Sequence, residues 1–219
     1  MKILLTGASS GIGKAIKQKL KNYEIITLCR NCDIKIDFND IEKVKKIQIE
    51  NVSGIIHNAG VGYFGQFEDI RLEKIEEMIN VNFLSPMILT KNHLKSIKKN
   101  KGFIINISST SAIHPAKFGV VYGATKAALR HFGVSLFEEA RKSRVKVCTI
   151  VPDLTLTNFH KNTFFKPSSN ELAHIKPEDI AEIVKNTINS PAHLVMQEIV
   201  IKPQLFKLEK INNNDNDKR

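Results

Sequence analysis

The feature that most constrains the fold is a glycine-rich turn between a short apolar segment and an amphipathic segment. Residues 2–6 are mostly apolar, Gly7, Gly11 and Gly13 follow, and residues 14–21 carry apolar side chains at helical spacing. Glycines let a backbone approach a diphosphate closely, and the amino end of a helix presents free N–H groups to it. The order of strand, glycine turn and helix therefore predicts a dinucleotide-binding unit. The alternative is a glycine turn that binds no ligand.

The rest of the chain alternates strand-like and helix-like segments. Only a few residues separate the second expected strand from the third, which leaves no room for a normal crossover helix. The rhythm predicts an α/β fold with a doubly wound, mostly parallel Rossmann-type sheet of about seven strands, which binds ligands at the carboxyl ends of its strands. After the first strand, the expected strands are residues 24–28, 34–37, 53–57, 102–107, 146–151 and 197–201, and the expected helices are 41–50, 71–99 with interruptions near Asn80–Asn82 and Pro86, 122–141, and 177–190.

The length and composition bound the number of domains. A chain of 219 residues with 42% hydrophobic residues supports one well-buried core. We expect a single domain at residues 1–204 and a disordered polar tail at residues 205–219. No apolar run approaches the roughly 20 residues that span a membrane, and the start of the chain leads into the glycine turn rather than a cleavage site. We therefore expect a cytoplasmic protein that does not associate with membranes.

The cysteines carry little functional signal. Cys29, Cys32 and Cys148 are an odd count without the spacing of a secreted disulfide scaffold, which favours a reducing compartment. Cys29 and Cys32 form a lone C-x-x-C motif. A zinc site would need two more ligands at similar spacing, and a redox pair would need its own fold context. We therefore expect these two cysteines to be structural, and we expect no metal site.

The net charge is strongly positive. An excess of 33 Lys and Arg over 22 Asp and Glu gives +11, which attracts nucleic acid, acidic carrier proteins or phosphorylated ligands. The lysines are scattered among helix-like segments, and the sequence lacks the aromatic and arginine clusters that read nucleic acid. We expect a solvated basic surface and no nucleic-acid partner.

Tyr122 and Lys126 form a candidate proton-transfer pair. They stand at positions i and i+4 of a segment that is predicted to be helical, so they share one face of the helix. A cation beside a phenol favours the phenolate and lowers the pKa of the tyrosine, which would let Tyr122 exchange protons near neutral pH. The alternative is an aromatic ring packed under a lysine stem.

The end of the second expected strand predicts the choice of cofactor. In dinucleotide-binding sheets the residue that selects the cofactor follows this strand, about 20 residues after the glycines. Cys29 and Arg30 stand here, so no carboxylate receives a ribose 2′-hydroxyl, whereas a guanidinium suits a 2′-phosphate. We expect NADP(H) as the preferred cofactor, with NAD(H) as the alternative. Asp33 is the competing selector if the strand is longer.

With these residues in view, the chain resembles the short-chain dehydrogenase/reductase family over residues 1 to about 204. Ser109 lies 13 residues before Tyr122, as the family places its serine. Two C-terminal segments, residues 176–181 and 197–203, resemble more weakly the branch of NADP-dependent 3-hydroxy acid and serine dehydrogenases. The matching motifs, in the family's order, are Thr6-Gly7-x3-Gly11-Ile12-Gly13, Asn58-Ala59-Gly60, Asn82, Ser109 and Tyr122-x3-Lys126.

The resemblance implies a set of catalytic and cofactor-binding residues. Tyr122 would be the catalytic acid/base, Ser109 would hydrogen-bond the substrate oxygen, and Lys126 would bind the nicotinamide ribose and lower the pKa of Tyr122. Asn82 would hold a water molecule in a proton relay. The implied cofactor-binding residues are Gly7, Ser9, Ser10, Gly11, Ile12, Gly13, Arg30, Asp37 at the adenine, Asn58, Ala59, Gly60, Tyr122, Lys126, and Thr155 and Thr157 at the carboxamide and diphosphate.

Two residues depart from the family's pattern, and a loop remains to be placed. His57 stands where the family usually has asparagine, and we expect a satisfied structural histidine there. Asp153 replaces the usual glycine after the sixth strand and brings an acid near the nicotinamide pocket. Ser108 and Ser111 are solvent-facing or structural alternatives. We expect the loop 153–169 to line or cover the substrate pocket with Phe159, Lys161, Phe164, Phe165 and Lys166.

The resemblance implies an oxidoreductase that transfers a hydride between NADP(H) and a carbonyl or secondary alcohol of a small substrate. One alternative is reduction of 3-oxoacyl groups on an acidic carrier protein, and an alternative of another class is a non-catalytic dinucleotide-binding regulator. A homodimer or homotetramer is expected, because family members pair subunits through the helices that correspond to residues 71–99 and 122–141.

Overall fold

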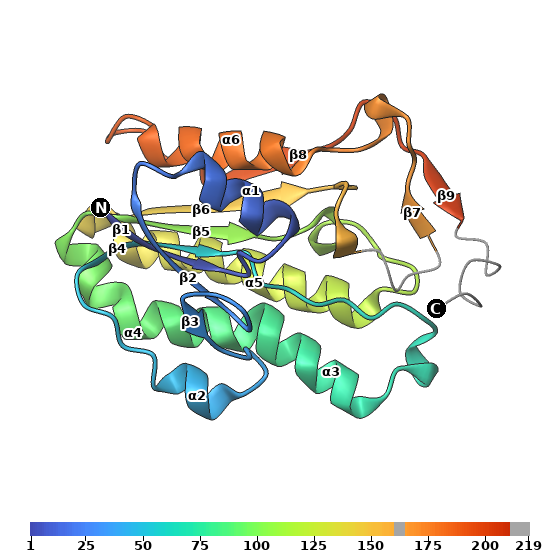
Figure 1. The fold of residues 1–219 in the computed structure, drawn as a ribbon, viewed down its shortest axis with the longest axis horizontal. Coiled ribbons are helices and arrows are strands. Elements are labelled where there is room, and N and C mark those ends of the chain that lie inside the picture. The colour runs from blue at the N-terminus through green and yellow to red at the C-terminus, as the bar shows by residue number, and fades with distance from the viewer. Residues whose placement is uncertain (160–164, 211–219) are drawn as a thin grey trace.

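A seven-stranded parallel sheet organises the protein (Figure 1). The computed structural model describes residues 1–159 and 165–210. The strands of the sheet are β1 (Lys2–Thr6), β2 (Glu24–Cys29), β3 (Ile34–Lys35), β4 (Val52–His57), β5 (Phe103–Ile107), β6 (Lys146–Pro152) and β8 (Glu198–Ile201). Their spatial order is β3-β2-β1-β4-β5-β6-β8, and every neighbouring pair is parallel. The chain changes direction across the sheet between β1 and β4, which confirms the predicted doubly wound fold.

Helices cover both faces of the sheet. They are α1 (Gly11–Lys19), α2 (Ile41–Lys45), α3 (Leu72–Ile79), α4 (Ser85–Lys99), α5 (Val120–Ala140) and α6 (Pro177–Asn189). Figure 1 shows α1 and α6 together on one face, and α4 and α5 on the other with α2 and α3 beyond them. Helix α2 ends at Lys45, so it is shorter than the helix expected at residues 41–50.

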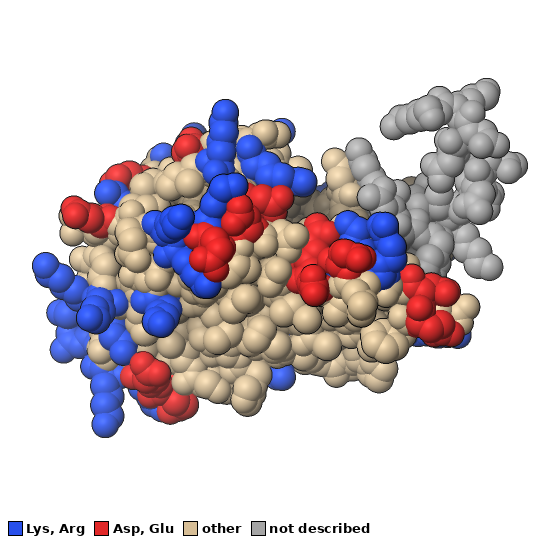
Figure 2. Space-filling view, turned by 90° about the horizontal axis from the view of Figure 1, so that it is seen from below, with Lys and Arg blue, Asp and Glu red and all other residues tan. Residues whose placement is uncertain are grey.

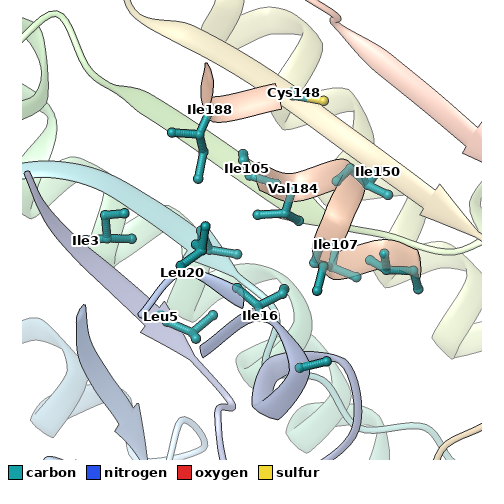
Figure 3. Packing of buried hydrophobic residues seen from close by; sticks show 14 of the residues in the cluster. Ile3, Leu5, Ile16, Leu20, Ile105, Ile107, Cys148, Ile150, Val184 and Ile188 are labelled. Atoms are coloured by element: carbon teal, nitrogen blue, oxygen red, sulfur yellow. The ribbon is translucent and has the colours of Figure 1, made fainter. Parts of the chain in front are cut away.

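The core consists of two apolar layers, one on each face of the sheet. Side chains alternate along β1, so Ile3 and Leu5 join the layer under α1 and α6, and Leu4 joins the layer under α4 and α5. In the first layer Ile16 of α1 packs with Val184 of α6 (Figure 3). Because both faces are covered, the strands are almost entirely apolar, as expected for a parallel sheet.

A single π-helical turn divides the long helical segment after residue 71. Residues Asn80–Leu84 form this turn between α3 and α4, and Asn82 within it is fully buried. The predicted interruption at Asn80–Asn82 is therefore present. Pro86 does not break a helix, because it lies in the first turn of α4, where its missing N–H costs no hydrogen bond.

The connection between β2 and β3 is unusually short for a parallel pair. Residues 30–33 lead from Cys29 back to Ile34, which pairs with Leu28, whereas parallel neighbours normally need a crossover of about a dozen residues. Two local links hold the turn. The Asp33 carboxylate accepts hydrogen bonds from the Thr27 backbone N–H at 3.0 Å and the Thr27 hydroxyl at 2.7 Å. Cys29 and Cys32 are joined by a disulfide.

This disulfide was not predicted from the sequence. The turn brings the Cα atoms of Cys29 and Cys32 to 5.0 Å, within the range that a disulfide requires. Cys148 is a buried free cysteine in β6. The Cys29–Cys32 disulfide forms because the crossover between β2 and β3 is tight. The sequence spacing indicated this tight crossover but did not show that the two sulfurs meet.

The C-terminal segment differs from the expected tail. Strand β7 (Phe165–Pro167) pairs antiparallel with β9 (Leu208–Lys210), and the Glu209 carboxylate accepts a hydrogen bond from the Ser168 hydroxyl at 2.8 Å. This pairing corrects the expected domain boundary at residue 204 for residues 208–210. Residues 211–219 of the expected tail lie outside the described residues. Within the described ranges, no helix is long and apolar enough to cross a membrane.

Candidate active site

A cavity of about 760 Å³ opens at the carboxyl ends of the strands. The segments that line it include the turn between β1 and α1, the end of β2 and the segments that follow β3, β4, β5 and β6, together with side chains of α3 and α5. All of the predicted site residues except Gly13 and Asn82 contribute to its wall. The parallel sheet produces this convergence, because the carboxyl ends of parallel strands meet along one edge.

The glycine turn approaches neighbouring backbone too closely for a side chain. Gly7 and Gly11 have φ of +70° and +50°, a region that glycine adopts without strain. A Cβ on Gly7 would lie 2.8 Å from the Ala59 Cα, and one on Gly13 would lie 2.1 Å from the Gly7 carbonyl oxygen. Gly13 therefore packs α1 against the turn and does not line the cavity. The Asn58 side chain holds the turn by donating to the carbonyl oxygens of Thr6 at 3.1 Å and Gly7 at 2.9 Å.

This turn fits a dinucleotide diphosphate. The amino end of α1 faces the cavity through Ser10, Gly11 and Ile12, and its first turn contains no acidic residue. Its N–H groups and the positive end of the helix dipole suit an anion.

Arg30 stands at the other rim, next to the end of β2. Arg30 is exposed and lines the cavity. The competing selector, Asp33, directs its carboxylate to Thr27, and these hydrogen bonds hold the pKa of Asp33 below its ordinary value. Glu77 of α3, which our sequence analysis missed, also lines the cavity and accepts hydrogen bonds from Lys74 and Tyr63 at 2.8 and 2.9 Å. Asp37 is exposed on the same wall and accepts from the Asn39 N–H at 2.9 Å.

Tyr122 and Lys126 share one buried face of α5, as their spacing predicts. The Lys126 Nζ lies 5.8 Å from the centre of the Tyr122 ring and donates to the Ile107 carbonyl oxygen at 2.9 Å. Tyr122 hydrogen-bonds the Ser109 side chain, whose hydroxyl oxygen also accepts from the Ser111 N–H at 3.2 Å. Ser108 points elsewhere, because its hydroxyl donates to the Lys126 carbonyl oxygen at 3.0 Å. A phenol, a hydroxyl and an ammonium thus meet at one end of the cavity.

Burial dominates the ionisation of this pair. It raises the pKa of Tyr122 to about 12, although the hydrogen bond from Ser109 partly opposes the shift. It lowers the pKa of Lys126 to about 8. The Tyr122 pKa is therefore raised rather than lowered in the protein alone, because desolvation of the phenolate outweighs the Ser109 hydrogen bond, and the effect of Lys126 on Tyr122 remains a prediction.

Asn82 is tied to backbone rather than to the cavity. Its side-chain oxygen accepts from the Val61 N–H at 2.8 Å, and its amide nitrogen donates to the Val61 carbonyl oxygen at 2.8 Å and to the Thr125 hydroxyl at 3.0 Å. Thr125 in turn donates to the Tyr122 carbonyl oxygen at 2.9 Å. Asn82 thus connects the segment after β4 to α5, and its role in a water relay remains a prediction.

Aromatic rings surround the Tyr122 phenol. Phe64 and Phe159 lie 5.4 and 5.5 Å from the Tyr122 ring, centre to centre, and 6.3 Å from each other. The sequence pointed to Phe159 but not to Phe64, although the Gly62-Tyr63-Phe64-Gly65 segment after β4 was a readable signal. Lys161 and Phe164, which were expected to cover the pocket, lie outside the described residues.

The two departures from the family pattern differ in position. Asp153 lines the cavity, and its carboxylate accepts from the Thr110 hydroxyl at 3.1 Å and the Leu154 N–H at 2.9 Å. His57 lies inside the sheet, and its Nε2 is 2.9 Å from the Thr90 hydroxyl. Its Nδ1 has no hydrogen-bond partner among the described residues, so the expectation of a satisfied histidine is only half correct. Burial lowers the pKa of His57 to about 3, which keeps the ring neutral.

The remaining predicted residues follow β6. Thr155 is buried, and its hydroxyl donates to the Asp153 carbonyl oxygen at 2.9 Å. The Thr157 side chain faces the glycine turn, since a Cβ on Gly11 would lie 3.1 Å from the Thr157 Cγ2. The segment after β6 therefore closes the cavity over the turn.

Known proteins match this chain over most of its length. Residues 14–167 match the family model for short chain dehydrogenases. An uncharacterised oxidoreductase of Staphylococcus epidermidis is 29% identical over 224 residues, which covers 91% of this chain and 96% of the relative. A similar oxidoreductase of Staphylococcus aureus is 27% identical over 91% of this chain and 96% of its own.

Solved structures share the fold. An alcohol dehydrogenase from the archaeon Thermococcus sibiricus, in complex with 5-hydroxy-NADP, has a TM-score of 0.82 at 24% identity, and the match covers 92% of this chain and 96% of that one. Serine dehydrogenase from Escherichia coli has a TM-score of 0.77 at 26% identity, covering 93% of this chain and 98% of that one.

The buried Lys126 should make the stability of the fold depend on pH. Its pKa of about 8 in the folded protein lies below its ordinary value of 10.5, so the unfolded chain binds more protons between these pH values. The free energy of unfolding should therefore rise with pH across this window, by about 1–2 kcal/mol between roughly pH 7.5 and roughly pH 9.5. Urea unfolding at both pH values would show this rise in the wild type and its loss in Lys126→Met. An identical pH dependence in the two proteins would contradict the buried charge.

Proposed function

The chain belongs to the short-chain dehydrogenase/reductase family and is an NAD(P)-dependent oxidoreductase. We propose that it uses NADP(H) to interconvert a carbonyl and a secondary alcohol on a small molecule. The observation that carries the proposal is the layout of one cavity. Tyr122 and Ser109 lie at one end of it, and the glycine turn and Arg30 line the other. This layout suits a long ligand with anionic groups at one end and a reactive carbon at the other.

The residues at the reactive end suit proton transfer to a carbonyl oxygen. A bound nicotinamide supplies or accepts the hydride. Tyr122 donates the proton to the substrate oxygen in the reductive direction and accepts it in the oxidative direction. Ser109 donates a hydrogen bond to the same oxygen and keeps it beside the phenol. The pKa of about 12 keeps Tyr122 protonated at neutral pH, which favours the reductive role in the protein alone.

Lys126 would bind the cofactor and would also assist the oxidative direction. Its ammonium lies inside the cavity wall and would hold the nicotinamide ribose by hydrogen bonds. A cation 5.8 Å from the ring also stabilises the phenolate after proton transfer. Asn82 positions this machinery by holding the Val61 backbone on one side and Thr125 on the other.

The proposed preference for NADP(H) rests on Arg30. The guanidinium is exposed at the rim, where a 2′-phosphate on the adenosine ribose would lie, and Asp33 is occupied by Thr27. The Thermococcus relative in complex with 5-hydroxy-NADP supports this assignment. Asp37 lines the same wall, and we assign it to the adenine.

A small substrate is favoured over an acyl chain on a carrier protein. The aromatic rings of Phe64, Tyr122 and Phe159 narrow the reactive end of the cavity. Figure 2 shows Lys and Arg side chains gathered at the end of the molecule where α4 finishes, away from the cavity end. Exposed cations at this end precede β5 and β6: Lys99, Lys101, Arg141, Lys142 and Arg144. An acidic carrier protein attracted there would lie far from Tyr122.

A second groove, between α4 and α5, favours a homo-oligomer. This groove is mostly apolar and has a volume of about 480 Å³. Its lining includes Met87, Ile88, Leu94 and Phe132. The matching helices pair subunits in this family, so we propose a homodimer or homotetramer built on this face, in the cytoplasm.

Light scattering tests the assembly. The wild type should have at least twice the mass of one chain at micromolar concentration. Phe132→Asp places a charge in the groove and should shift the protein to the monomer, because an unpaired charge is costly in an apolar interface. Asn186→Asp, which adds the same charge on α6 at the opposite face, should not. A monomeric wild type would contradict the proposal.

Replacement of Tyr122 by phenylalanine tests the reaction. Tyr122→Phe keeps the ring in its aromatic cluster but removes the proton, so kcat should fall by about 10²-fold or more, while the Kd for NADPH changes little. Tyr23→Phe, which removes a hydroxyl bonded to Asn189 far from the cavity, is the matched control and should keep full activity. The assay follows loss of NADPH absorbance with a panel of small carbonyl compounds. Full activity of Tyr122→Phe on a compound that the wild type reduces would show that Tyr122 is only a packing residue.

Cofactor choice is tested at Arg30. Arg30→Ala should weaken NADPH binding by about 10- to 100-fold, the usual scale for a charge-assisted hydrogen bond, and leave NADH binding nearly unchanged. Arg144→Ala removes an exposed cation at the opposite end of the molecule and controls for the change in net charge. Titration of both cofactors by fluorescence gives the dissociation constants. Equal losses for NADPH and NADH, or tighter binding of NADH by the wild type, would assign the choice to another residue.

A further inference from the structure

The turn between β2 and β3 contains two cysteines, Cys29 and Cys32, that take no part in the proposed reaction. Cys29 and Cys32 enclose Arg30 and Asn31, and Cys29, Arg30 and Asn31 all line the cofactor cavity. Neither cysteine lies near Tyr122 in the chain or contributes to the proton-transfer group. We propose that Cys29 and Cys32 form a reversible thiol–disulfide exchange site, which takes low-molecular-weight disulfides and thiols and whose oxidised form holds Arg30 ready for NADP(H).

The oxidised turn is anchored at both ends. Cys29 is the last residue of β2 and pairs with Lys35 of β3, and its carbonyl oxygen accepts a hydrogen bond from the Ile36 N–H at 3.1 Å. Asp33 is fixed to Thr27 by two hydrogen bonds to its carboxylate. Between these anchors, the disulfide is the covalent link across residues 30–32, while Cys32 packs against the edge of the core and the Arg30 charge faces Glu77 of α3. The bond therefore controls how freely Arg30 moves.

The short crossover makes this control effective. A normal crossover would carry a helix whose packing fixes the residue after β2, but here residues 30–33 have no helix to support them. Reduction would free the backbone at Arg30 and Asn31 while leaving the strand pairing of Leu28 and Cys29 intact. Ordering a mobile side chain on binding costs affinity, so a looser turn would bind the 2′-phosphate less tightly.

The two cysteines differ in exposure, which defines the order of the exchange. Cys32 is half-buried and packs at the edge of the core, whereas Cys29 is 7% exposed. The Cys32 thiolate attacks an incoming disulfide RSSR, forms a mixed disulfide and releases one RS⁻. The Cys29 thiolate then attacks the Cys32 sulfur and releases the second RS⁻. Two electrons pass from the protein to RSSR, and the two protons lost by the cysteines are taken up by the two RS⁻ groups or by solvent.

Cys148 offers an internal control. It is a buried free cysteine in β6, and burial raises the pKa of its thiol to about 12, which keeps it protonated and unreactive. Any fast and reversible change with thiol reagents therefore belongs to Cys29 and Cys32.

The experiment compares cofactor binding in the two redox states. Full-length protein is treated with excess dithiothreitol or excess oxidised glutathione and freed of reagent, and the disulfide is counted by mass as the loss of two hydrogens. We expect reduction to weaken NADPH binding by about three- to tenfold, with a smaller change for NADH. Cys32→Ser should bind NADPH like the reduced wild type and should not respond to either reagent. Cys148→Ser should respond as the wild type does.

The inference rests on the proposed use of NADP(H), and the same titrations separate the two ideas. The ratio of NADPH to NADH affinity at one redox state tests the cofactor choice, whereas the change of NADPH affinity between redox states tests the exchange site. Two results would overturn the exchange site: a Cys29–Cys32 pair that stays reduced in excess oxidised glutathione, or equal NADPH affinity in two states that mass spectrometry proves distinct. A redox response that persists in Cys32→Ser would also overturn it.

Discussion

The structure depends on the close approach of the first glycine turn to the end of β4. A side chain on Gly7 would collide with the Ala59 backbone, and one on Gly13 would collide with the Gly7 carbonyl. The absence of both side chains lets α1 lie against the sheet with its amino end at the cavity. Asn58, the residue after β4, then holds the turn by hydrogen bonds from its side chain. The anion-binding end of the cavity is thus a result of backbone packing as much as of any charged group.

At the reactive end the controlling quantity is the cost of burying charge. Tyr122 and Lys126 are both nearly inaccessible, and burial moves both pKa values toward the neutral forms. The Ile107 carbonyl is the hydrogen-bond acceptor of the Lys126 ammonium. A dinucleotide ribose would add hydroxyl groups around this ammonium and favour its charged form, which in turn would favour the phenolate. Cofactor binding and the acidity of Tyr122 are therefore coupled in this account.

Local pattern was enough to predict the sheet, the glycine turn and the shared face of Tyr122 and Lys126. Periodicity and spacing determine these features within a few residues. Three others depend on contacts between distant parts of the chain. The pairing of Asn82 with Val61 needs the π-helical turn, and the aromatic contact of Phe64 with Tyr122 needs the segment after β4 to cross α5. The direction of the Tyr122 pKa shift depends on how deeply the side chain is buried, and the i, i+4 spacing does not predict burial.

Other differences arise from short segments whose partners lie nearby. The Cys29–Cys32 disulfide follows from a parallel crossover too short for a helix, and β9 follows from pairing with β7. In both cases composition indicated an irregular or polar segment, but it could not show which atoms meet. Arg30, by contrast, was placed from sequence because β2 ends at Cys29, one residue before it.

The central claim is that one dinucleotide lies across the cavity from Arg30 to Tyr122. A crystal structure of the protein soaked with NADP⁺ tests it most directly. The account predicts the 2′-phosphate against the Arg30 guanidinium, the diphosphate at the amino end of α1, and the nicotinamide beside Tyr122 with its ribose on Lys126. A diphosphate bound away from α1, or a nicotinamide that lies outside the cluster of Phe64, Tyr122 and Phe159, would contradict it.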